Sequence, residues 1–500
     1  MTYATHLDLY QLTSLVPHWD AGRGRATVWM SFFSRRLPKD LSGETARGAI
    51  IWAGLQRCLT WLKEAQFDEA RLQTLCAHPM LGPALKSRPE LLNALRDWRF
   101  RGEVWAPEEG EILWAGRALN ARHEPIDIGG VKPSAMPPYL QVCTDLLTAK
   151  LIETPLLSII NHMSMVATKA AHLYLAAGDR SILEFGSRRT HIEAAVDAAV
   201  AAYIGGSSGT SNVEANHRYG VPVLGTMDHF AVQSWEERGR SSAETEKAFF
   251  RAFIRAYPDQ ASLLVDTYDM FGEQTGIRNA IRAAQEEDAP LKSIRIDSAL
   301  TPETLEHARA LLDDMGCHQT EIIASGGVDE DLILQLSGSP VDRFGVGERL
   351  VSSADAPVGV GAVGKLSWIE GQTSMKRALG SGKATLPGPI QALRTSTHDQ
   401  LYLVPVEQLR DSWSFNWEQS YPRSCEGHSL LKQVWLDDHP VGDSISEGWL
   451  ERARQRAHDR LLGALQGDVP SSELSRVRLK SHPVLLDEDL IEAIRDRCSS

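Results

Sequence analysis

Charged and polar side chains recur directly after short apolar segments between residues 181 and 349 of this 500-residue chain. The candidates for chemistry among them are Arg188, Asp228, His229, Arg295 and Asp297. Arginine guanidinium groups bind phosphate oxygens in a bidentate manner, and aspartate accepts hydrogen bonds from ribose hydroxyls. The alternation of the two residue types therefore indicates a site for a sugar phosphate. A surface salt bridge is the alternative role for Arg188.

Two glycine-containing turns follow apolar segments later in the same region. The first contains Ser325, Gly326 and Gly327, and the second contains Gly345 and Gly347. Backbone N–H groups that have no neighbouring Cβ atom can surround an anion. The two turns together predict a phosphate site, although each one alone is equally compatible with a tight connection from strand to helix.

His229 is the candidate for a reactive side chain. It follows Asp228 and is predicted to lie just beyond the end of a strand. A neighbouring carboxylate can orient an imidazole and raise its basicity. His229 can then act as a nucleophile toward a phosphoryl group or as a general base. A structural histidine with satisfied hydrogen bonds is the alternative. Asp266 and Asp269 either hold a metal-bound water or cap a helix.

Apolar strands alternate with helical segments from about residue 150 to about residue 370. The predicted strands are Ile182–Phe185, Val221–Leu224, Ser262–Asp266, Ser293–Asp297, Glu321–Ala324 and Arg343–Val346. Helices between most of these strands imply a parallel sheet, and a closed α/β barrel is the simplest way to arrange about six or seven such units. The carboxyl ends of the strands, and with them the candidate residues, then meet at one rim.

The flanking regions have a different character. Residues 1–150 are predicted to form an α+β domain, residues 151–370 the α/β barrel, and residues 371–500 a C-terminal segment that includes terminal helices. A length of 500 residues is enough for more than one domain.

Composition excludes several classes of protein. The net charge of −13 and the absence of a Lys/Arg block argue against a nucleic-acid partner. No apolar run reaches about 18 residues and no leader pattern is present, so we expect neither a membrane span nor a signal peptide. The six cysteines are scattered without a CxxC pair, which indicates reduced thiols and a cytoplasmic protein.

The chain resembles the nicotinate phosphoribosyltransferase family, a group of type II phosphoribosyltransferases, nearly from end to end. The matching motifs are DLYQLT at 8–13, ETPLLSIIN at 153–161, ATKAA at 167–171, EFGSRR at 184–189, AAYIGG at 201–206, GTSN at 209–212, YGVPVLGTM at 219–227, LLVDTYD at 263–269, RIDS at 295–298, IIASGG at 322–327, FGVGERLVSS at 344–353, LPG at 386–388 and SHPVLLDEDL at 481–490. The order of so many motifs carries the resemblance, because each one alone is weak.

The resemblance implies a fold, a reaction and an assembly. The fold is a distorted α/β barrel beside a sandwich domain that the N-terminal part and a later segment build together. The reaction joins nicotinate to phosphoribosyl pyrophosphate, gives nicotinate mononucleotide and pyrophosphate, and is coupled to ATP hydrolysis through a phosphohistidine. Mg²⁺ accompanies the diphosphate. The assembly is a homodimer whose subunits share the active sites.

The resemblance also implies roles for particular residues. His229 corresponds to the phosphorylated histidine, and Phe185 to the aromatic ring on which the pyridine stacks. Tyr10 corresponds to a ring on the opposite face, supplied by the other subunit. The groups around the base and ribose are Arg188, Thr210, Ser211, Arg295 and Asp297, and the phosphate-binding groups are Ser325, Gly326, Gly327, Gly345 and Gly347. Ser211 replaces an aspartate of the related nicotinamide-using enzymes, which favours an acid as the substrate.

Three positions depart from the family pattern and keep two alternatives open. Asp228 and Phe230 flank His229 in place of a small residue and serine, Ala299-Leu300 replaces Gly-Asp, and Gly327 stands where an aspartate is frequent. One alternative is a phosphoribosyltransferase for another heteroaromatic acid. The other is a non-catalytic homologue that binds nucleotides.

Overall fold

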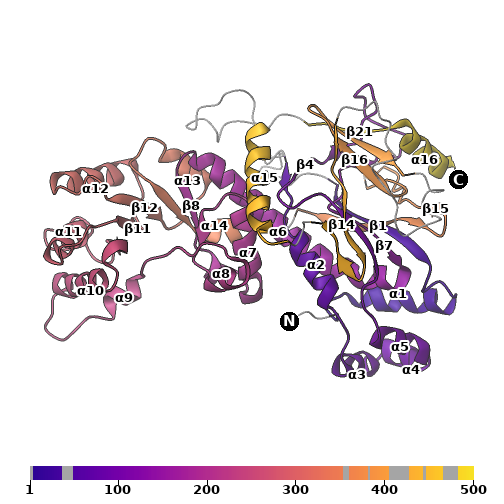
Figure 1. Cartoon of the computed structure of the whole chain (residues 1–500), viewed down its shortest axis with the longest axis horizontal. Coiled ribbons are helices and arrows are strands. Elements are labelled where there is room, and N and C mark those ends of the chain that lie inside the picture. The colour runs from indigo at the N-terminus through magenta and orange to yellow at the C-terminus, as the bar shows by residue number, and fades with distance from the viewer. Residues whose placement is uncertain are drawn as a thin grey trace. The chain divides into compact units, whose positions relative to one another are not determined.

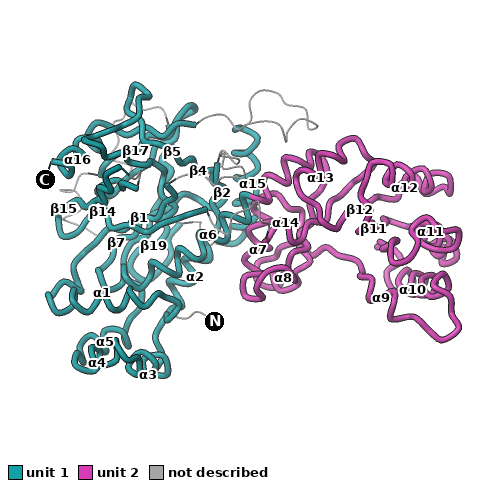
Figure 2. Tube along the Cα trace, turned by 180° about the vertical axis from the view of Figure 1, so that it is seen from behind, with its two compact units in different colours: residues 1–168, 357–464, 479–500 teal, residues 169–356, 465–478 magenta. Residues whose placement is uncertain are grey.

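A computed structural model describes residues 4–35, 49–352, 360–380, 383–404, 427–442, 446–464 and 482–499. The chain separates into two compact units (Figure 2). Unit 1 takes its described residues from 1–168, 357–464 and 479–500, and unit 2 takes its described residues from 169–356. The first boundary falls within the long helix α6 (Leu146–Ala177), and the chain returns to unit 1 after unit 2.

Unit 1 is built on a seven-stranded antiparallel sheet (Figure 1). In spatial order its strands are β15 (Gln372–Thr373), β14 (Ala362–Ile369), β1 (Thr27–Ser34), β7 (Leu140–Asp145), β3 (Gly102–Ala106), β19 (Lys432–Asp437) and β20 (His439–Pro440). Central strand β1 pairs with both β7 and β14, so segments more than 300 residues apart complete one sheet. Strands from the N-terminal part and from later parts of the chain therefore share one hydrogen-bonded sheet.

Smaller sheets and helices complete unit 1. A four-stranded sheet has the order β18 (His428–Ser429), β16 (Ile390–Arg394), β17 (Asp399–Leu403) and β21 (Val484–Leu486). Two-stranded sheets pair β2 (Ile50–Ile51) with β4 (Ile112–Leu113) and β5 (Gly116–Arg117) with β6 (Ser134–Ala135). The helices are α1 (Leu9–Asp20), α2 (Leu55–Glu64), α3 (Glu69–Ala77), α4 (Leu81–Lys86), α5 (Pro89–Arg96), α15 (Trp449–Gly463) and α16 (Glu488–Ser499).

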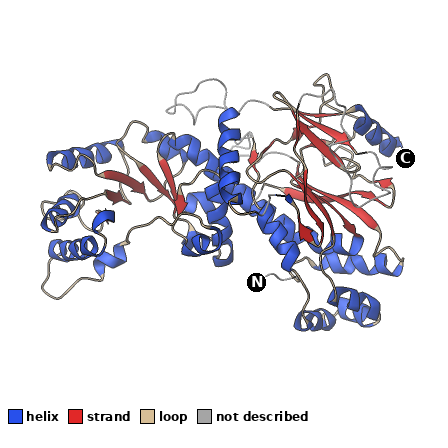
Figure 3. Cartoon of the chain, in the orientation of Figure 1, coloured by secondary structure: helices blue, strands red, loops and turns tan. Residues whose placement is uncertain are grey.

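Unit 2 contains a six-stranded parallel sheet with helices on its outer side (Figure 3). In spatial order the strands are β10 (Ser262–Leu264), β11 (Ser293–Ile296), β12 (Glu321–Ser325), β13 (Arg343–Val346), β8 (Ser181–Glu184) and β9 (Gly209–Thr210). The helices are α7 (Ile192–Ile204), α8 (Val213–Tyr219), α9 (His229–Gln233), α10 (Ser242–Ala256), α11 (Gly276–Glu286), α12 (Pro302–Asp314), α13 (Glu330–Gln335) and α14 (Glu348–Val351). Apolar strand residues such as Ile294, Ile322 and Phe344 are fully buried, as parallel strands covered on both faces require.

The parallel barrel predicted from the sequence is confirmed as a curled α/β sheet, but the barrel is not closed. β13 pairs with β8, which joins the last strand to the first, whereas no ladder joins β9 to β10 within the continuous described stretch 49–352. The strand predicted at Val221–Leu224 is wrong, because this segment forms only an isolated bridge between Val223 and Thr210. The missing strand leaves a gap in the sheet between β9 and β10.

The sequence also led to expectations about the cysteines and about membrane spans. None of the described cysteines, which exclude Cys425, is in a disulfide. Among the described residues, no helix combines the length and the apolar character needed to cross a bilayer.

Helix α10 is fastened to α11 by a buried carboxylate. Glu246 Oε2 accepts hydrogen bonds from Gly276 N at 2.7 Å and from Asn279 Nδ2 at 2.9 Å. Its other oxygen has no partner among the described residues. Burial raises the pKa of Glu246 to about 7, and the two hydrogen bonds only partly oppose that shift.

A Glu246→Gln variant is expected to change how stability depends on pH. Because the folded state holds this proton more tightly than the unfolded chain, wild-type stability falls as pH rises from 4.5 to about 7. Gln keeps an acceptor oxygen and removes the charge. The free energy of unfolding of the variant should therefore lack a pH-dependent contribution that is on the order of 3 kcal/mol at most in the wild type.

Thermal unfolding from pH 4 to 8 measures this effect, with the exposed Glu306→Gln as a control that keeps the wild-type profile. Identical pH profiles for wild type and Glu246→Gln would contradict the assignment.

Candidate active site

The carboxyl ends of β8, β11, β12 and β13 bring most of the predicted residues together. Phe185 follows β8, Asp297 follows β11, Ser325 ends β12, and Gly345 lies in β13 opposite Ser325. Two cavities open at this rim, and both are lined by Phe185, Arg188 and Asp297. The shared lining makes them neighbouring compartments of one site.

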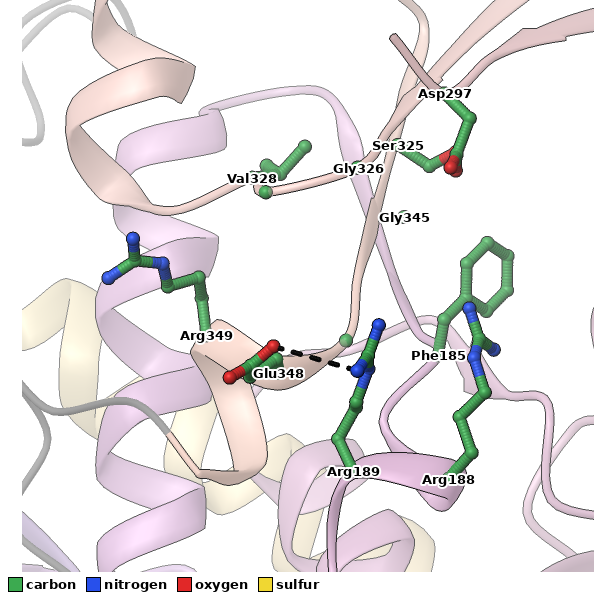
Figure 4. A pocket seen from close by; sticks show the side chains of 12 residues that line it. Phe185, Arg188, Arg189, Asp297, Ser325, Gly326, Val328, Gly345, Glu348 and Arg349 are labelled. Carbon is green, nitrogen blue, oxygen red and sulfur yellow. Dashed lines mark hydrogen bonds and ion pairs between the residues drawn. The ribbon is translucent and has the colours of Figure 1, made fainter.

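The smaller cavity, of about 140 Å³, has the character of an anion site (Figure 4). It is lined by Phe185, Arg188, Arg189, Asp297, Ser325, Gly326, Gly327, Val328, Gly345, Gly347, Glu348 and Arg349. Every residue that the sequence predicts for phosphate binding is in this set. Arg189 Nη1 lies 4.0 Å from Glu348 Oε2, and Figure 4 shows the side chains of Arg188 and Arg189 extending in the same direction.

Glycine is required at two of these positions by close approach of neighbouring atoms. Gly326 has φ +92°, and a Cβ there would lie 2.0 Å from the carbonyl oxygen of Asp297. A Cβ on Gly345 would lie 2.5 Å from the Phe185 ring and 3.0 Å from Ser325 Cβ. The Phe185 ring therefore packs directly on the backbone of the neighbouring strand.

Gly345→Ala should displace the Phe185 ring and weaken binding of any base that stacks on it. Overpacking of this kind costs about 1–3 kcal/mol, and we expect KM for the base to rise at least about tenfold, which corresponds to about 1.4 kcal/mol. Steady-state kinetics with each substrate varied in turn measures the effect. Gly116→Ala is a matched control, because nothing lies within 4 Å of a Cβ at that position. An unchanged KM for the base would show that the ring is not a binding surface.

The larger cavity, of about 640 Å³, combines polar and aromatic walls. It is lined by Phe185, Arg188, Ser211, Gly225, Thr226, Met227, Asp228, Ala231, Phe249, Phe253, Arg295 and Asp297. The arginines and Ser211 suit a carboxylate, and Phe185 suits a flat ring. This cavity can therefore take an aromatic acid, while the smaller cavity takes phosphate.

A hydrogen-bond network fixes the carboxylates between the two cavities. Asp297 Oδ1 accepts from the Ser325 hydroxyl, and Asp297 N donates to Asp266 Oδ2 at 2.9 Å. Ser298 Oγ donates to the same Asp266 oxygen at 2.6 Å. The Asp266 side chain is only 3% exposed, and its Oδ1 has no hydrogen-bond partner among the described residues. Asp297 is thus held in place with its negative charge facing the shared space.

Arg295 is a buried cation beside these carboxylates. One terminal nitrogen, Nη1, donates to the Met227 carbonyl at 2.9 Å, and its Nε has no partner within the described part of the chain. Burial lowers the pKa of Arg295, while Asp297 and Asp266 act in the opposite direction. Arg295 lines the larger cavity, where its guanidinium group can attract an anionic ligand.

His229 lies near this network, but its environment differs from the prediction. It begins α9 instead of following a strand, and the Asp228 carboxylate caps α9 by accepting from Ala231 N at 2.9 Å. His229 Nδ1 lies 3.1 Å from Thr267 Oγ1, and its Nε2 lies 4.0 Å from the free oxygen of Asp266. Thr267 and Asp266, not Asp228, therefore orient the imidazole, whose side chain is 40% exposed.

Comparison with known proteins shows the family of this chain. The family described as quinolinate phosphoribosyl transferase, C-terminal domain, matches residues 166–356. Nicotinate phosphoribosyltransferase pncB1 of Mycobacterium tuberculosis (strain CDC 1551 / Oshkosh) is 37% identical over 389 residues, covering 78% of this chain and 77% of that protein. The chain belongs to the nicotinate phosphoribosyltransferase family.

Further comparisons support membership of the nicotinate phosphoribosyltransferase family and its fold. The nicotinate phosphoribosyltransferase of Bacillus subtilis (strain 168) is 33% identical over 392 residues, covering 77% of this chain and 71% of the relative. A crystal structure of human nicotinic acid phosphoribosyltransferase has the same fold, with a TM-score of 0.74, 24% identity, and coverage of 98% of this chain and 99% of that one.

Two of the base-binding residues predicted for the nicotinate phosphoribosyltransferase site lie elsewhere than in the cavity walls. Thr210 is fully buried and its hydroxyl donates to Glu184 Oε2. Tyr10 lies on α1 of unit 1, where its ring is 53% exposed, whereas all residues lining the two cavities belong to unit 2. A role for Tyr10 in the site of a partner subunit stays a prediction.

Glu184 is a residue beside the site that sequence reasoning missed. Its buried carboxylate accepts from Gly186 N and from the Thr210 hydroxyl, and its carbonyl accepts from Ser211 N at 2.9 Å. Burial raises its pKa. One acidic residue thus ties the segment that carries Phe185 to the segment that carries Ser211. The only signal in the sequence was a glutamate at the end of an otherwise apolar strand.

Proposed function

We propose that this protein transfers the phosphoribosyl group of phosphoribosyl pyrophosphate to nicotinate and thereby forms nicotinate mononucleotide and pyrophosphate. The observation that carries the proposal is the pair of cavities that meet at Phe185 and Asp297. An aromatic acid on one side and a phosphorylated sugar on the other would place their reacting atoms at this junction. The relatives' names supply the identity of the acid.

The proposed reaction breaks the bond between ribose C1 and the pyrophosphate oxygen and forms a bond from C1 to the pyridine nitrogen. The bonding electrons leave with pyrophosphate, so positive charge develops on the ribose before the nitrogen attacks. The fixed carboxylate of Asp297 stabilises that charge. Phe185 holds the ring face, and Arg188 binds the carboxylate, which together set the attack geometry.

The proposed choice of nicotinate over nicotinamide rests on Ser211. Its side chain lines the larger cavity, and its backbone N–H is engaged by Glu184. A serine hydroxyl can donate to a carboxylate, whereas an aspartate at this position would repel it.

The residues present fit a Mg²⁺ ion that enters with the diphosphate. No cluster of three or more metal-ligating side chains occurs among the described residues. Mg²⁺ is commonly held by one or two carboxylates together with substrate phosphates. Asp297, which lines both cavities, could supply one of those ligands. When bound, the ion would neutralise charge on the departing pyrophosphate.

ATP coupling through a phosphohistidine is the finer part of the proposal. His229 would accept the γ-phosphoryl group at Nε2, because Nδ1 is engaged with Thr267. The proposal further includes a homodimer in which Tyr10 of one subunit covers the base bound by the other, and a cytoplasmic location.

The deciding experiment incubates the protein with nicotinate, phosphoribosyl pyrophosphate and Mg²⁺, with and without ATP. Chromatography should detect nicotinate mononucleotide in both reactions and more of it, together with ADP, when ATP is present. Nicotinamide offered instead should give little product. If neither reaction yields nicotinate mononucleotide, the proposed function is refuted, and binding without turnover would favour the non-catalytic alternative.

A further inference from the structure

The far wall of the larger cavity is aromatic and belongs to helix α10. Phe249 and Phe253 both line the cavity, and their ring centroids are 6.1 Å apart. Trp235 continues the stack at 5.9 Å from Phe249, and Tyr257 continues it at 5.0 Å from Phe253. Four aromatic rings thus run along this side of unit 2, and the two central ones face the site.

The gap in the sheet is what exposes this wall to the site. Because Val221–Leu224 forms only one bridge, no strand fills the space between β9 and β10. The loop residues Gly225, Thr226 and Met227 line the cavity instead. Glu246 fastens α10 to α11, so the phenyl rings are carried by an anchored helix and not by a loop.

The larger cavity reaches beyond the residues assigned to the pyridine carboxylate. Its volume is about 640 Å³, against about 140 Å³ for the smaller cavity beside it, and Phe249 and Phe253 line its far side. Two buried polar atoms of its lining, Thr226 Oγ1 and Arg295 Nε, have no partner among the described residues. The space thus combines unsatisfied polar groups near Asp297 with an apolar far side.

We propose that this enzyme accepts nicotinates enlarged at ring carbon 5, and that Phe249 and Phe253 are the residues that determine this specificity. The inference rests on the proposed function. With the pyridine nitrogen facing ribose near Asp297 and the carboxylate facing Arg188, the edge around carbon 5 would face the remaining walls, Phe249 and Phe253 among them. An added aryl group there stacks on Phe249 and Phe253, as aromatic rings prefer offset or edge-to-face pairs.

The test compares nicotinate with 5-phenylnicotinate as the acceptor for the full-length protein. We expect kcat/KM for 5-phenylnicotinate to lie within about tenfold of the nicotinate value, because a pocket closed around one ring would reject a second ring by more than about 100-fold. No mononucleotide from 5-phenylnicotinate, under conditions in which nicotinate reacts, would overturn the inference.

Alanine variants test whether Phe249 and Phe253 are the residues that bind the added phenyl group. Phe249→Ala and Phe253→Ala should each raise KM for 5-phenylnicotinate about tenfold more than they raise KM for nicotinate. Tyr257→Ala, which removes a ring of the same stack that does not line the cavity, is the matched control. Equal effects on both substrates would show that the wall acts on folding alone, and circular dichroism of each variant checks the fold.

The same experiment distinguishes failure of the enlarged acceptor site from failure of the proposed function. Turnover of neither acid refutes the proposed function. Turnover of nicotinate alone refutes only the enlarged acceptor site. Turnover of 5-phenylnicotinate without nicotinate keeps the acceptor site and replaces nicotinate as the substrate.

Discussion

Asp297→Asn should lower kcat by about 100- to 1,000-fold, a larger effect than the one on KM for phosphoribosyl pyrophosphate. Asparagine has nearly the same shape and can still accept from Ser325, so the fold of the rim is preserved. It lacks the negative charge that faces the developing ribose cation at the junction of the two cavities. An interaction that is strongest in the transition state appears in kcat and not in ground-state binding.

Steady-state kinetics of the purified variant measures this effect. Asp314→Asn, which removes an exposed carboxylate on the surface of α12, is the matched control and should retain wild-type rates. A kcat within threefold of wild type for Asp297→Asn would remove this carboxylate from the chemistry and leave it a structural role at the end of β11.

His229→Ala should abolish the stimulation by ATP and leave a basal transferase rate. The imidazole is the nucleophile toward ATP in the proposed coupling, and neither Asp297 nor the glycine turns depend on it for a hydrogen bond. With ATP present we expect kcat/KM to fall by about 100-fold, the lower range for loss of a reactive side chain. Without ATP the variant and the wild type should agree within about threefold.

Labelling with γ-³²P-ATP gives an independent measurement. Wild type should acquire acid-labile, base-stable label, and His229→Ala should acquire none. His217→Ala, which removes an exposed histidine on α8, should label normally. Full ATP stimulation in His229→Ala would contradict the phosphohistidine and leave an ATP effect to another part of the protein.

The sheet of unit 2 was largely predictable because most of its strands have a recognisable pattern in their own local sequence. Segments such as Glu321–Ser325 are short, apolar and followed by glycine, and each is buried on both faces. Val221–Leu224 has the same local character, yet it does not join the sheet beyond one bridge. Pairing depends on whether a neighbouring strand edge is within reach, which is a tertiary property, so local pattern alone could not reveal the gap between β9 and β10.

The rim residues were predictable for a similar reason, and the groups that orient them were not. Parallel strands place Phe185, Asp297 and Ser325 at one edge, so their proximity follows from topology. The hydrogen-bond partner of His229 could not be predicted from the sequence. Thr267 is 38 residues away, and the adjacent Asp228 caps a helix. Adjacency in sequence was a poor guide to adjacency in space at this point.

The neighbouring residues Gly326 and Gly327 are constrained for different reasons, and this matters for anyone who wishes to redesign the enzyme. Gly326 is pressed against the carbonyl of Asp297, so a saturation library at that codon should return only the parent residue. Gly327 has φ +70° but open space around a Cβ, so asparagine or aspartate can occupy it at modest cost. An engineered acidic group intended to tighten the hold on a divalent ion therefore belongs at position 327.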